Sequence, residues 1–475
     1  MKRFMILAGV LLALGLVGLV AFWFGTPRLQ NFSPQDGSLD VSTSAALRLT
    51  FSRSMRPDSV LEHLKFEPSV PGSFNWQGRT LVFTPDQRWP AGEVINVNLS
   101  KGAQAGGWLP LPTLQTGNWA FTVRQPSLLY LYPSNGAANL YLYDPRTEQS
   151  SALTNLLGGI LEFTALEDGS AVYYSVENGQ GGSDIYRLAL GKDLTNLRAS
   201  LVLGCQRARC RAPHAAPKED FLAYERIEPS GSSQPNYPRV YLVQLKTEQD
   251  EAGELTITTN GDPVLAIDNL HQTIQPDWSL DGVLSFYDTN QQSFIILDPY
   301  TREITALQNQ TGEPGSWQPG SQFYVASEIY FNTAGNPDTV PDLQAVASSH
   351  LLRYDISDGS FEDLTNTEGL EDTSPAISPD GNWIAFARKF LDISRWTPGR
   401  QLWLMKSDIS EAHQLTNEPD YNTYNISWEP DGNRLAYVRF NQTAPTDLPA
   451  IWVYDLVKNY EAEWVPGGYS PQWIP

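Results

Sequence analysis

The segment 378–386 reads SPDGNWIAF, and the segment 429–437 reads EPDGNRLAY. Each is preceded by Leu-Thr-Asn, at 364–366 and 415–417, and each is followed by a second apolar run. One pattern therefore occurs twice in tandem. A tandem repeat of this kind indicates stacked supersecondary units, none of which buries its apolar face alone.

Each repeat contains a predicted hairpin. The Asp-Gly pairs at 380–381 and 431–432 lie between apolar runs, and Asp-Gly supplies the positive φ angles of tight turns. The runs that follow, 383–387 and 435–438, do not alternate with polar residues, so we expect both of their faces to be buried. Small antiparallel sheets stacked as the blades of a propeller meet that condition.

These residues also carry a family resemblance. Segment 378–386, followed by LWLM at 402–405 and QLTN at 414–417, resembles the repeat of TolB-like β-propellers. Weaker copies are QPDWSLDG at 275–282, SWQPG at 316–320 and LEDG at 166–169. The resemblance covers residues 127 to 475 and implies a propeller, and it implies an envelope protein as partner. The part of that family that contacts its partner has no match here.

The copies predict seven blades in residues 126–475. Seven pairs of apolar runs can be assigned as the second and third strands of a blade, and the first pair has no preceding Trp-bearing strand. The chain ends with the unaccompanied segment YSPQWI at 469–474. We expect it to complete the first blade, which closes the ring and removes its free edge.

The first residues predict a membrane anchor. Lys2 and Arg3 precede 21 residues, from Phe4 to Phe24, that carry no charge, a length that spans a bilayer as a helix. A cleaved signal peptide has a shorter apolar core and a small-x-small site, and no Cys follows that could carry a lipid. We therefore assign residues 1–25 to a transmembrane signal anchor, with the rest of the chain in an extracytoplasmic location at the cell membrane.

Residues 26–125 predict a β-sandwich of about seven strands. Runs such as 46–52, 94–99 and 119–123 alternate apolar with polar residues, which is typical of strands with one buried face. The segments LTFSRSM at 49–55 and LVFTP at 81–85 resemble bacterial Ig-like domains of cell-envelope proteins. In that family the domain is a spacer or an adhesive module. The expected fold class is thus all-β, with an anchor, a sandwich and a propeller.

The charge balance restricts the partners. With 32 basic and 53 acidic residues the formal net charge is −21, which repels phosphate backbones and excludes a nucleic-acid partner. The sequence has no phosphate-cradling glycine loop, so it implies no nucleotide, and we expect no cofactor. The acidity favours solubility of an exposed ectodomain over cation binding.

Long connections predict a binding rim. They fall between the second and third strands of four blades, at 226–238, 329–349, 389–400 and 441–449, and these loops emerge on one side of a propeller. Loops on a rigid scaffold are frequent binding sites, although insertions also accumulate where they disturb nothing. Aromatic residues and Arg are the commonest anchors, and the candidates are Tyr237, Tyr330, Arg395, Trp396 and Tyr424.

The two cysteines predict a disulfide. Cys205 and Cys210 bracket four residues, and outside the cytoplasm a close pair favours a disulfide over two free thiols. Metal binding is the lesser alternative, because two sulfurs are not four ligands and no His stands at a finger-like spacing. His214 is near in sequence, and we interpret it as incidental.

Catalytic motifs are missing from the sequence. It has no Gly-x-Ser-x-Gly elbow, and its five His residues form no His-Glu-x-x-His pattern, so we expect no catalytic and no metal-ligating residue. The favoured interpretation is a binding or scaffold protein for a protein, a peptide or an envelope glycan. The alternatives are a glycan hydrolase or lyase with its site at the propeller channel, and a sensor ectodomain.

Overall fold

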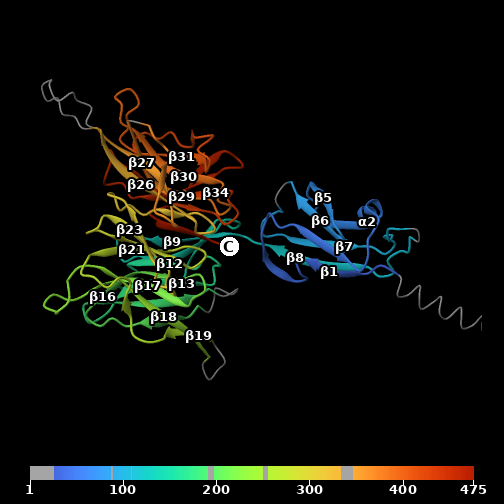
Figure 1. Cartoon of the computed structure of the whole chain (residues 1–475), viewed down its shortest axis with the longest axis horizontal. Coiled ribbons are helices and arrows are strands. Elements are labelled where there is room, and N and C mark those ends of the chain that lie inside the picture. Colours follow the sequence, from blue (N-terminus) through green and yellow to red (C-terminus); the bar gives the residue numbers. More distant parts are fainter. Residues whose placement is uncertain are drawn as a thin grey trace, which may run out of the picture. The chain divides into compact units, whose positions relative to one another are not determined.

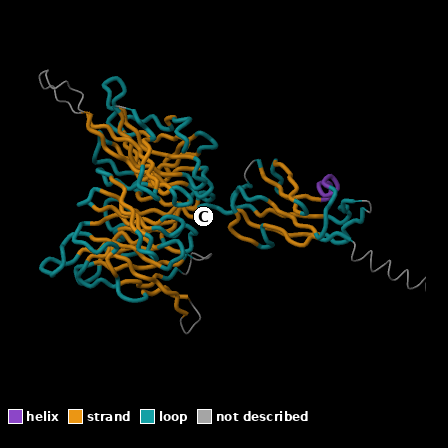
Figure 2. Tube along the Cα trace, viewed as in Figure 1, coloured by secondary structure: helices purple, strands orange, loops and turns teal. Residues whose placement is uncertain are grey.

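The computed structural model describes residues 26–86, 89–107, 110–190, 197–249, 255–332, 346–367 and 369–475. These residues divide into two compact units, and the boundary lies between Gln125 and Pro126. Strands dominate both units, and a short helix belongs to the first (Figures 1 and 2). The fold is therefore all-β, as the sequence predicts.

The first unit is a sandwich of two four-stranded sheets. One sheet has the order β1-β3-β6-β5 and the other has the order β2-β8-β7-β4. The elements are β1 Leu29–Ser33, β2 Ser38–Val41, β3 Leu47–Phe51, α2 Pro57–His63, β4 Leu64–Glu67, β5 Gly72–Gln77, β6 Thr80–Pro85, β7 Val94–Leu99 and β8 Gly117–Val123.

The core of this sandwich follows the alternation of its strands. Residues 47, 49 and 51 of β3 and residues 95, 97 and 99 of β7 are buried, while the residues between them are more exposed. Trp89 packs against Phe83 and Phe121, and its indole Nε1 donates to the Ala45 carbonyl at 2.8 Å. Among the described residues the unit has eight strands and the helix α2, where the sequence predicted about seven strands. Only Val60 of α2 is buried, which gives the helix no apolar periodicity to detect.

The second unit contains the remaining strands. They are β9 Ser127–Tyr132, β10 Asn139–Asp144, β11 Gln149–Ala152, β12 Glu162–Ala165, β13 Ala171–Glu177, β14 Ser183–Ala189, β15 Ala199–Leu203, β16 Arg209–Ala215, β17 Phe221–Ile227, β18 Arg239–Gln249, β19 Leu255–Thr259, β20 Val264–Leu265, β21 Thr273–Trp278, β22 Leu284–Asp288, β23 Ser293–Leu297, β24 Ile304–Gln308, β25 Ser316–Trp317, β26 Phe323–Asn332, β27 Val346–Asp355, β28 Phe361–Asp363, β29 Leu370–Ile377, β30 Trp383–Phe390, β31 Gln401–Lys406, β32 His413–Gln414, β33 Tyr421–Trp428, β34 Arg434–Asn441, β35 Ala450–Asp455, β36 Tyr460–Pro466 and β37 Tyr469–Ile474.

These strands pair as successive antiparallel groups, each starting with an inner strand. The groups in chain order are β37-β9-β10-β11, β12-β13-β14-β15, β16-β17-β18 with β19 and β20, β21-β22-β23-β24, β25-β26-β27-β28, β29-β30-β31-β32 and β33-β34-β35-β36. The first group combines the last strand of the chain with three early ones. Strand β37 pairs with β9 from Tyr469↔Leu131 to Ile474↔Ser127, as the sequence predicts.

Hydrogen bonds join every group to the next around a ring. Adjacent turns link the β21 and β25 groups, and the other neighbouring inner strands are linked directly. The directly linked pairs are β37 and β12, β12 and β16, β16 and β21, β25 and β29, β29 and β33, and β33 and β37. The bonds are Ala165 N to Gln472 Oε1, Ala212 N to Glu162 Oε2, Trp278 Nε1 to His214 O, Ser321 Oγ to Asp281 Oδ2, Ile377 N to Ser316 Oγ, Trp428 Nε1 to Ala376 O and Trp473 N to Ser427 Oγ. The arrangement is a β-propeller with its inner strands around one channel.

A repeated bulge shapes five of the inner strands. Their register shifts at a residue with positive φ, and four of these residues precede a Pro. The five residues are Ala212, Gln275, Ser374, Asn425 and Ser470. The Gly of the following turn also has positive φ, for example Gly381 (73°) and Gly432 (68°). The turn prediction from Asp-Gly is therefore confirmed at both sites.

Closure of the ring by β37 gives a prediction about stability. Deleting residues 469–475 removes the buried side chains of Trp473 and Ile474 and leaves β9 with an open edge. We expect the free energy of unfolding of the propeller to fall by about 3 kcal/mol or more. Urea unfolding followed by intrinsic Trp fluorescence measures this loss. Gln472→Ala, which keeps the strand and removes one side-chain bridge to Ala165, should cost only about 1 kcal/mol. Equal midpoints for the deletion and the parent chain would contradict closure.

Candidate functional site

One mouth of the channel forms a cavity of about 280 Å³. Its wall includes the residue that directly precedes the Trp position in successive inner strands: Asp277, Ser316, Ala376, Ser427 and Gln472. Each of these residues follows a bulge or a Gly, so the bulge sets which side chain meets the channel. The cavity is therefore lined by side chains from widely separated parts of the chain.

Neighbouring backbone groups hold part of this wall. Ser316 Oγ accepts from the Ile377 amide at 3.0 Å, and Ser427 Oγ accepts from the Trp473 amide at 3.3 Å. Gln472 bridges both the amide and the carbonyl of Ala165. Because each side chain is tied to the next strand, the lining is pre-organised.

Three titratable groups meet in this part of the channel. His214 Nδ1 lies 3.3 Å from Asp277 Oδ1 and 3.2 Å from the Pro276 carbonyl. Glu167 lines the same cavity and interacts electrostatically with both His214 and Asp277. Solvent reaches both carboxylates, since the Asp277 side chain is 38% exposed and Glu167 is exposed, and the neighbouring strands enclose them only in part. Burial raises the pKa of Asp277 and of Glu167 above their ordinary values, and His214 opposes that rise.

A carboxylate pair beside an imidazole can transfer protons. A carboxyl whose pKa is raised keeps its proton at higher pH, and an adjacent His can exchange it. Sequence reasoning missed this cluster and interpreted His214 as incidental. The position directly before the inner-strand Trp, as in Asp277-Trp278, is a sequence signal for Asp277 alone, and no comparable signal marks Glu167 or His214.

The raised pKa of Asp277 predicts a pH-dependent effect of its replacement. The folded state holds the Asp277 proton more tightly than the unfolded chain, so this group favours folding most below its ordinary pKa. Its contribution is lost as pH rises through the folded pKa. Asp277→Asn cannot ionise, so we expect its stability relative to the parent to increase between about pH 3 and pH 8. Urea midpoints of both proteins across that range measure the trend. A constant difference would show that Asp277 ionises normally in the fold.

The loop 389–400 is exposed at its tip, residues 393–396, and follows the end of β30 opposite to its Asp-Gly turn. Asp392 Oδ2 pairs with Arg395 Nε at 2.7 Å, and Asp392 Oδ1 accepts from the Arg395 amide and from Ser394 Oγ. The Arg395 guanidinium lies 4.0 Å above the Phe390 ring. This frame leaves the side chains of Ile393 and Trp396 100% and 54% exposed.

The end of the same loop packs closely against the segment 419–421. A Cβ on Gly399 would lie 1.9 Å from the Tyr421 carbonyl oxygen, so only Gly fits there. The Gly399 amide donates to the Pro419 carbonyl at 2.9 Å, and the Lys389 ammonium lies 4.9 Å from the Trp396 ring. Of the predicted rim residues, Arg395 and Trp396 therefore share one well-defined loop.

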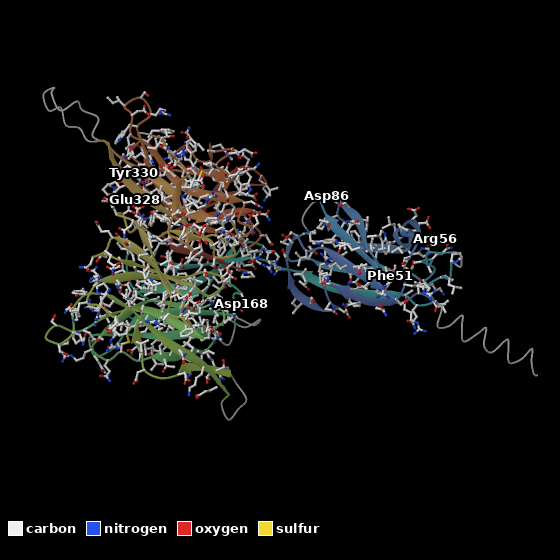
Figure 3. The ribbon with its side chains drawn as sticks, viewed as in Figure 1. Phe51, Arg56, Asp86, Asp168, Glu328 and Tyr330 are labelled. Atoms are coloured by element: carbon white, nitrogen blue, oxygen red, sulfur yellow. A yellow bond between two sulfur atoms is a disulfide. The ribbon has the colours of Figure 1, made fainter. Side chains whose placement is uncertain are left out.

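The other three predicted rim residues are half-buried. Tyr330 lies in β26 and not in a loop, because β26 and β27 continue their pairing through Ile329↔Ser349 and Tyr330↔Ser348 (Figure 3). Its ring packs 4.8 Å from that of His350. The predicted loop 329–349 is thus wrong in its described parts, and residues 333–345 of it lie outside the described residues.

Tyr424 and Tyr237 are likewise held by the fold. Tyr424 belongs to the inner strand β33 and packs against the Phe440 ring at 5.5 Å, so it does not stand on a loop. Tyr237 lies in a loop, and its hydroxyl donates to the Leu270 carbonyl. Among the described residues, the structure brings none of these three tyrosines onto the loop 389–400.

The two cysteines form a disulfide in this structure. Cys205 and Cys210 have Cα atoms 6.2 Å apart, and both are buried in the core of the second and third groups. The bridge ties the end of β15 to the start of β16. It therefore fixes the connector between two blades.

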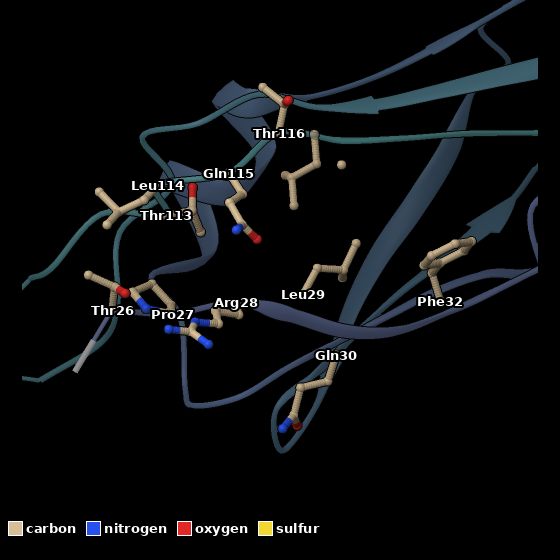
Figure 4. A pocket seen from close by; sticks show the side chains of 12 residues that line it. Thr26, Pro27, Arg28, Leu29, Gln30, Phe32, Thr113, Leu114, Gln115 and Thr116 are labelled. Carbon is tan, nitrogen blue, oxygen red and sulfur yellow. The ribbon is translucent and has the colours of Figure 1, made fainter. Parts of the chain in front are cut away.

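The Ig-like unit has a separate cavity of about 360 Å³ (Figure 4). It lies between the start of β1 and the segment before β8, and its lining mixes apolar and polar side chains: Leu29, Phe32 and Leu114 with Gln30, Gln115 and Thr116. No titratable cluster accompanies it among its described lining residues. We assign it no chemistry.

The described part of the chain contains neither a metal-ligand cluster nor a membrane-spanning helix. No group of three or more His, Cys, Asp or Glu side chains there could hold a metal ion. No helix within the described ranges has the length and hydropathy to cross a bilayer. The predicted anchor, from Phe4 to Phe24, lies outside those residues.

Comparisons with known proteins identify the first unit. Residues 25–123 match the family model described as a bacterial Ig-like domain. No curated protein matches the chain. The first unit is therefore a bacterial Ig-like domain, as the sequence resemblance predicts, and it precedes a β-propeller.

Several solved propeller structures are similar to the second unit. A TolB-type protein from Agrobacterium tumefaciens is 16% identical, covers 74% of this chain and 99% of its own, and has a TM-score of 0.37. TolB from Acinetobacter baumannii is 15% identical, with 74% and 83% covered and a TM-score of 0.37. An oligogalacturonate lyase in complex with manganese is 14% identical, with 72% and 85% covered and a TM-score of 0.43. Likeness at this level transfers no function, and the propeller architecture rests on the strand pairing itself.

Proposed function

We propose that this protein is a membrane-anchored, extracytoplasmic binding module in which an Ig-like spacer carries a seven-bladed propeller. The observation that supports binding is the loop 389–400, which holds Ile393 and Trp396 in solvent on a braced frame. Exposing a large apolar side chain costs free energy unless a partner covers it, and Trp is the most frequent anchor of protein interfaces.

The frame of this loop supports a protein or peptide partner over a small molecule. Its ion pair and the Arg395–Phe390 contact fix the backbone before binding, so little conformational entropy is lost on association. Neither of the two cavities described above is lined by residues of this loop, whereas small-molecule sites are concave pockets. An envelope protein or a peptide segment with an apolar cleft fits this shape.

The proposed location rests on residues 1–25 and on the cysteines. The apolar stretch from Phe4 to Phe24 supports a single-pass anchor, and the Cys205–Cys210 disulfide fits an oxidising compartment. The net charge of −21 suits an exposed, soluble ectodomain.

The binding proposal is tested by capture from cell envelopes with the full-length protein. We expect the parent to recover a partner and Ile393→Ala, Trp396→Ala to weaken its affinity about 30-fold, as loss of an interface anchor does. The matched control is Val457→Ala, Tyr460→Ala, which removes one exposed aliphatic and one exposed aromatic side chain (76% and 63% exposed) at the other end of the propeller. Equal recovery by both variants would remove the loop from the binding site.

An enzyme acting at the channel is the second candidate function. The observation that favours it is the pair Glu167 and Asp277 in one cavity, with His214 3.3 Å from Asp277, which supplies proton-transfer groups for a glycan hydrolase or lyase. We expect Asp277→Asn to lower turnover of an envelope glycan at least about 100-fold and to leave partner capture unchanged. If the parent turns over no glycan or peptide in a library, this second candidate fails and the binding proposal stands.

A further inference from the structure

The disulfide loop 204–210 carries two basic side chains without partners. Arg207 and Arg209 are exposed, and neither forms an ion pair or a side-chain hydrogen bond in the described part of the chain. Most other Arg side chains of the propeller are paired, as in Arg187–Glu219, Arg226–Glu228 and Arg388–Asp372. Two unpaired guanidinium groups within three residues are therefore unusual on a protein of net charge −21.

The backbone of this loop packs against the neighbouring turn, while its two Arg side chains lie in solvent. The Cys205 amide donates to Asp184 Oδ1 at 2.7 Å, and Asn178 Nδ2 donates to the Gln206 carbonyl at 2.8 Å. The Ser183 amide donates to the Ala208 carbonyl at 3.1 Å. The backbone is thus fixed against the turn between β13 and β14.

Gly182 shows how close this contact is. A Cβ at this position would lie 2.2 Å from the Ala208 carbonyl oxygen and 2.3 Å from that of Gln206. Only Gly allows the turn to meet the loop so closely. Together with the disulfide, this contact fixes the backbone at Arg207 and Arg209 before any ligand binds.

A cleft of about 260 Å³ adjoins the loop. Arg209 and Arg211 line it, with Glu162 and Glu177 on its other walls and Leu161 at its edge. Arg211 is occupied by Glu225 at 2.8 Å, so Arg209 is the guanidinium of the cleft that is available to a ligand. Leu161 is 39% exposed, and Leu157 in the same connector is fully exposed.

This combination of groups selects a class of ligand. Guanidinium groups bind carboxylates and phosphates as forked donors. Glu162 and Glu177 in the same cleft can accept hydrogen bonds from the backbone amides of a peptide, which a free phosphate does not offer. No aromatic ring lines the described cleft for a sugar to stack on, whereas the exposed leucines suit a protein surface.

We propose that the disulfide loop 204–210 and its cleft bind the carboxylate side chains of an acidic peptide segment, with Arg207 and Arg209 as the contacting groups. The loop lies at the same rim as the loop 389–400, since it connects the last strand of one group with the inner strand of the next. It belongs to other blades, however, and the inference does not depend on the apolar anchor.

The test is fluorescence anisotropy of the full-length protein with fluorescein-labelled hexaglutamate at low ionic strength. We expect saturable binding that Arg207→Ala, Arg209→Ala weakens about tenfold, since each exposed charge pair contributes up to about 1 kcal/mol. The control Arg146→Ala, Lys218→Ala removes the same charge from exposed positions in turns at the other end of the blades and should change affinity less than about twofold. The pair Arg207→Lys, Arg209→Lys keeps the charge without the fork and should give an intermediate value.

Each result decides the proposal. Absence of hexaglutamate binding, or equal weakening by the Arg207, Arg209 pair and the control pair, overturns it, provided that the thermal melts of all variants match the parent. Displacement of hexaglutamate by polygalacturonate at equal carboxylate concentration would replace the peptide by an acidic glycan, and displacement by inorganic phosphate would replace it by an anion site. Selective loss with the loop variants and no displacement supports the proposal.

Discussion

Each blade of this propeller is held to the next by hydrogen bonds, nearly all of them between adjacent inner strands. In these bonds an indole N–H or a side-chain oxygen contacts the backbone of the neighbouring inner strand, as Trp278 contacts His214 and Gln472 contacts Ala165. Each bond fixes the angle between two sheets. The bulge with positive φ turns the inner strand so that this contact is possible. The ring has no weak end only because β37 completes the first group. This closed set of contacts therefore fixes the positions of the channel, of the loop 389–400 and of the disulfide loop 204–210.

Much of this architecture can be predicted from the sequence, because it depends on short sequence patterns. The Asp-Gly turns need positive φ at Gly381 and Gly432, and the apolar runs after them need cover on both faces. Closure of the ring by residues 469–474 is predictable, because the first pair of propeller strands lacks an inner strand and one unpaired strand remains at the end of the sequence. The helix α2 was missed, since a single buried residue, Val60, leaves no pattern.

The candidate sites were only partly predictable. Trp396 stands out in sequence as an aromatic residue in a long connection, but Tyr330 does too, and it is half-buried because the hairpin of β26 and β27 continues past the expected strand end. The meeting of Glu167, His214 and Asp277 could not be foreseen. Three residues from three blades converge only when the bulges set which side chains face the channel, and local pattern does not encode that orientation.

The pairing of β37 with β9 also bears on how the protein carries mechanical load. The linker from the Ig-like unit enters the propeller at β9, and β9 is hydrogen-bonded to β10 on one side and to β37 on the other. A pull on the linker therefore acts along two antiparallel ladders at once and must shear both before the strand leaves. The last strand of the chain thus adds a second ladder that must be sheared where a pull on the Ig-like unit would enter the propeller.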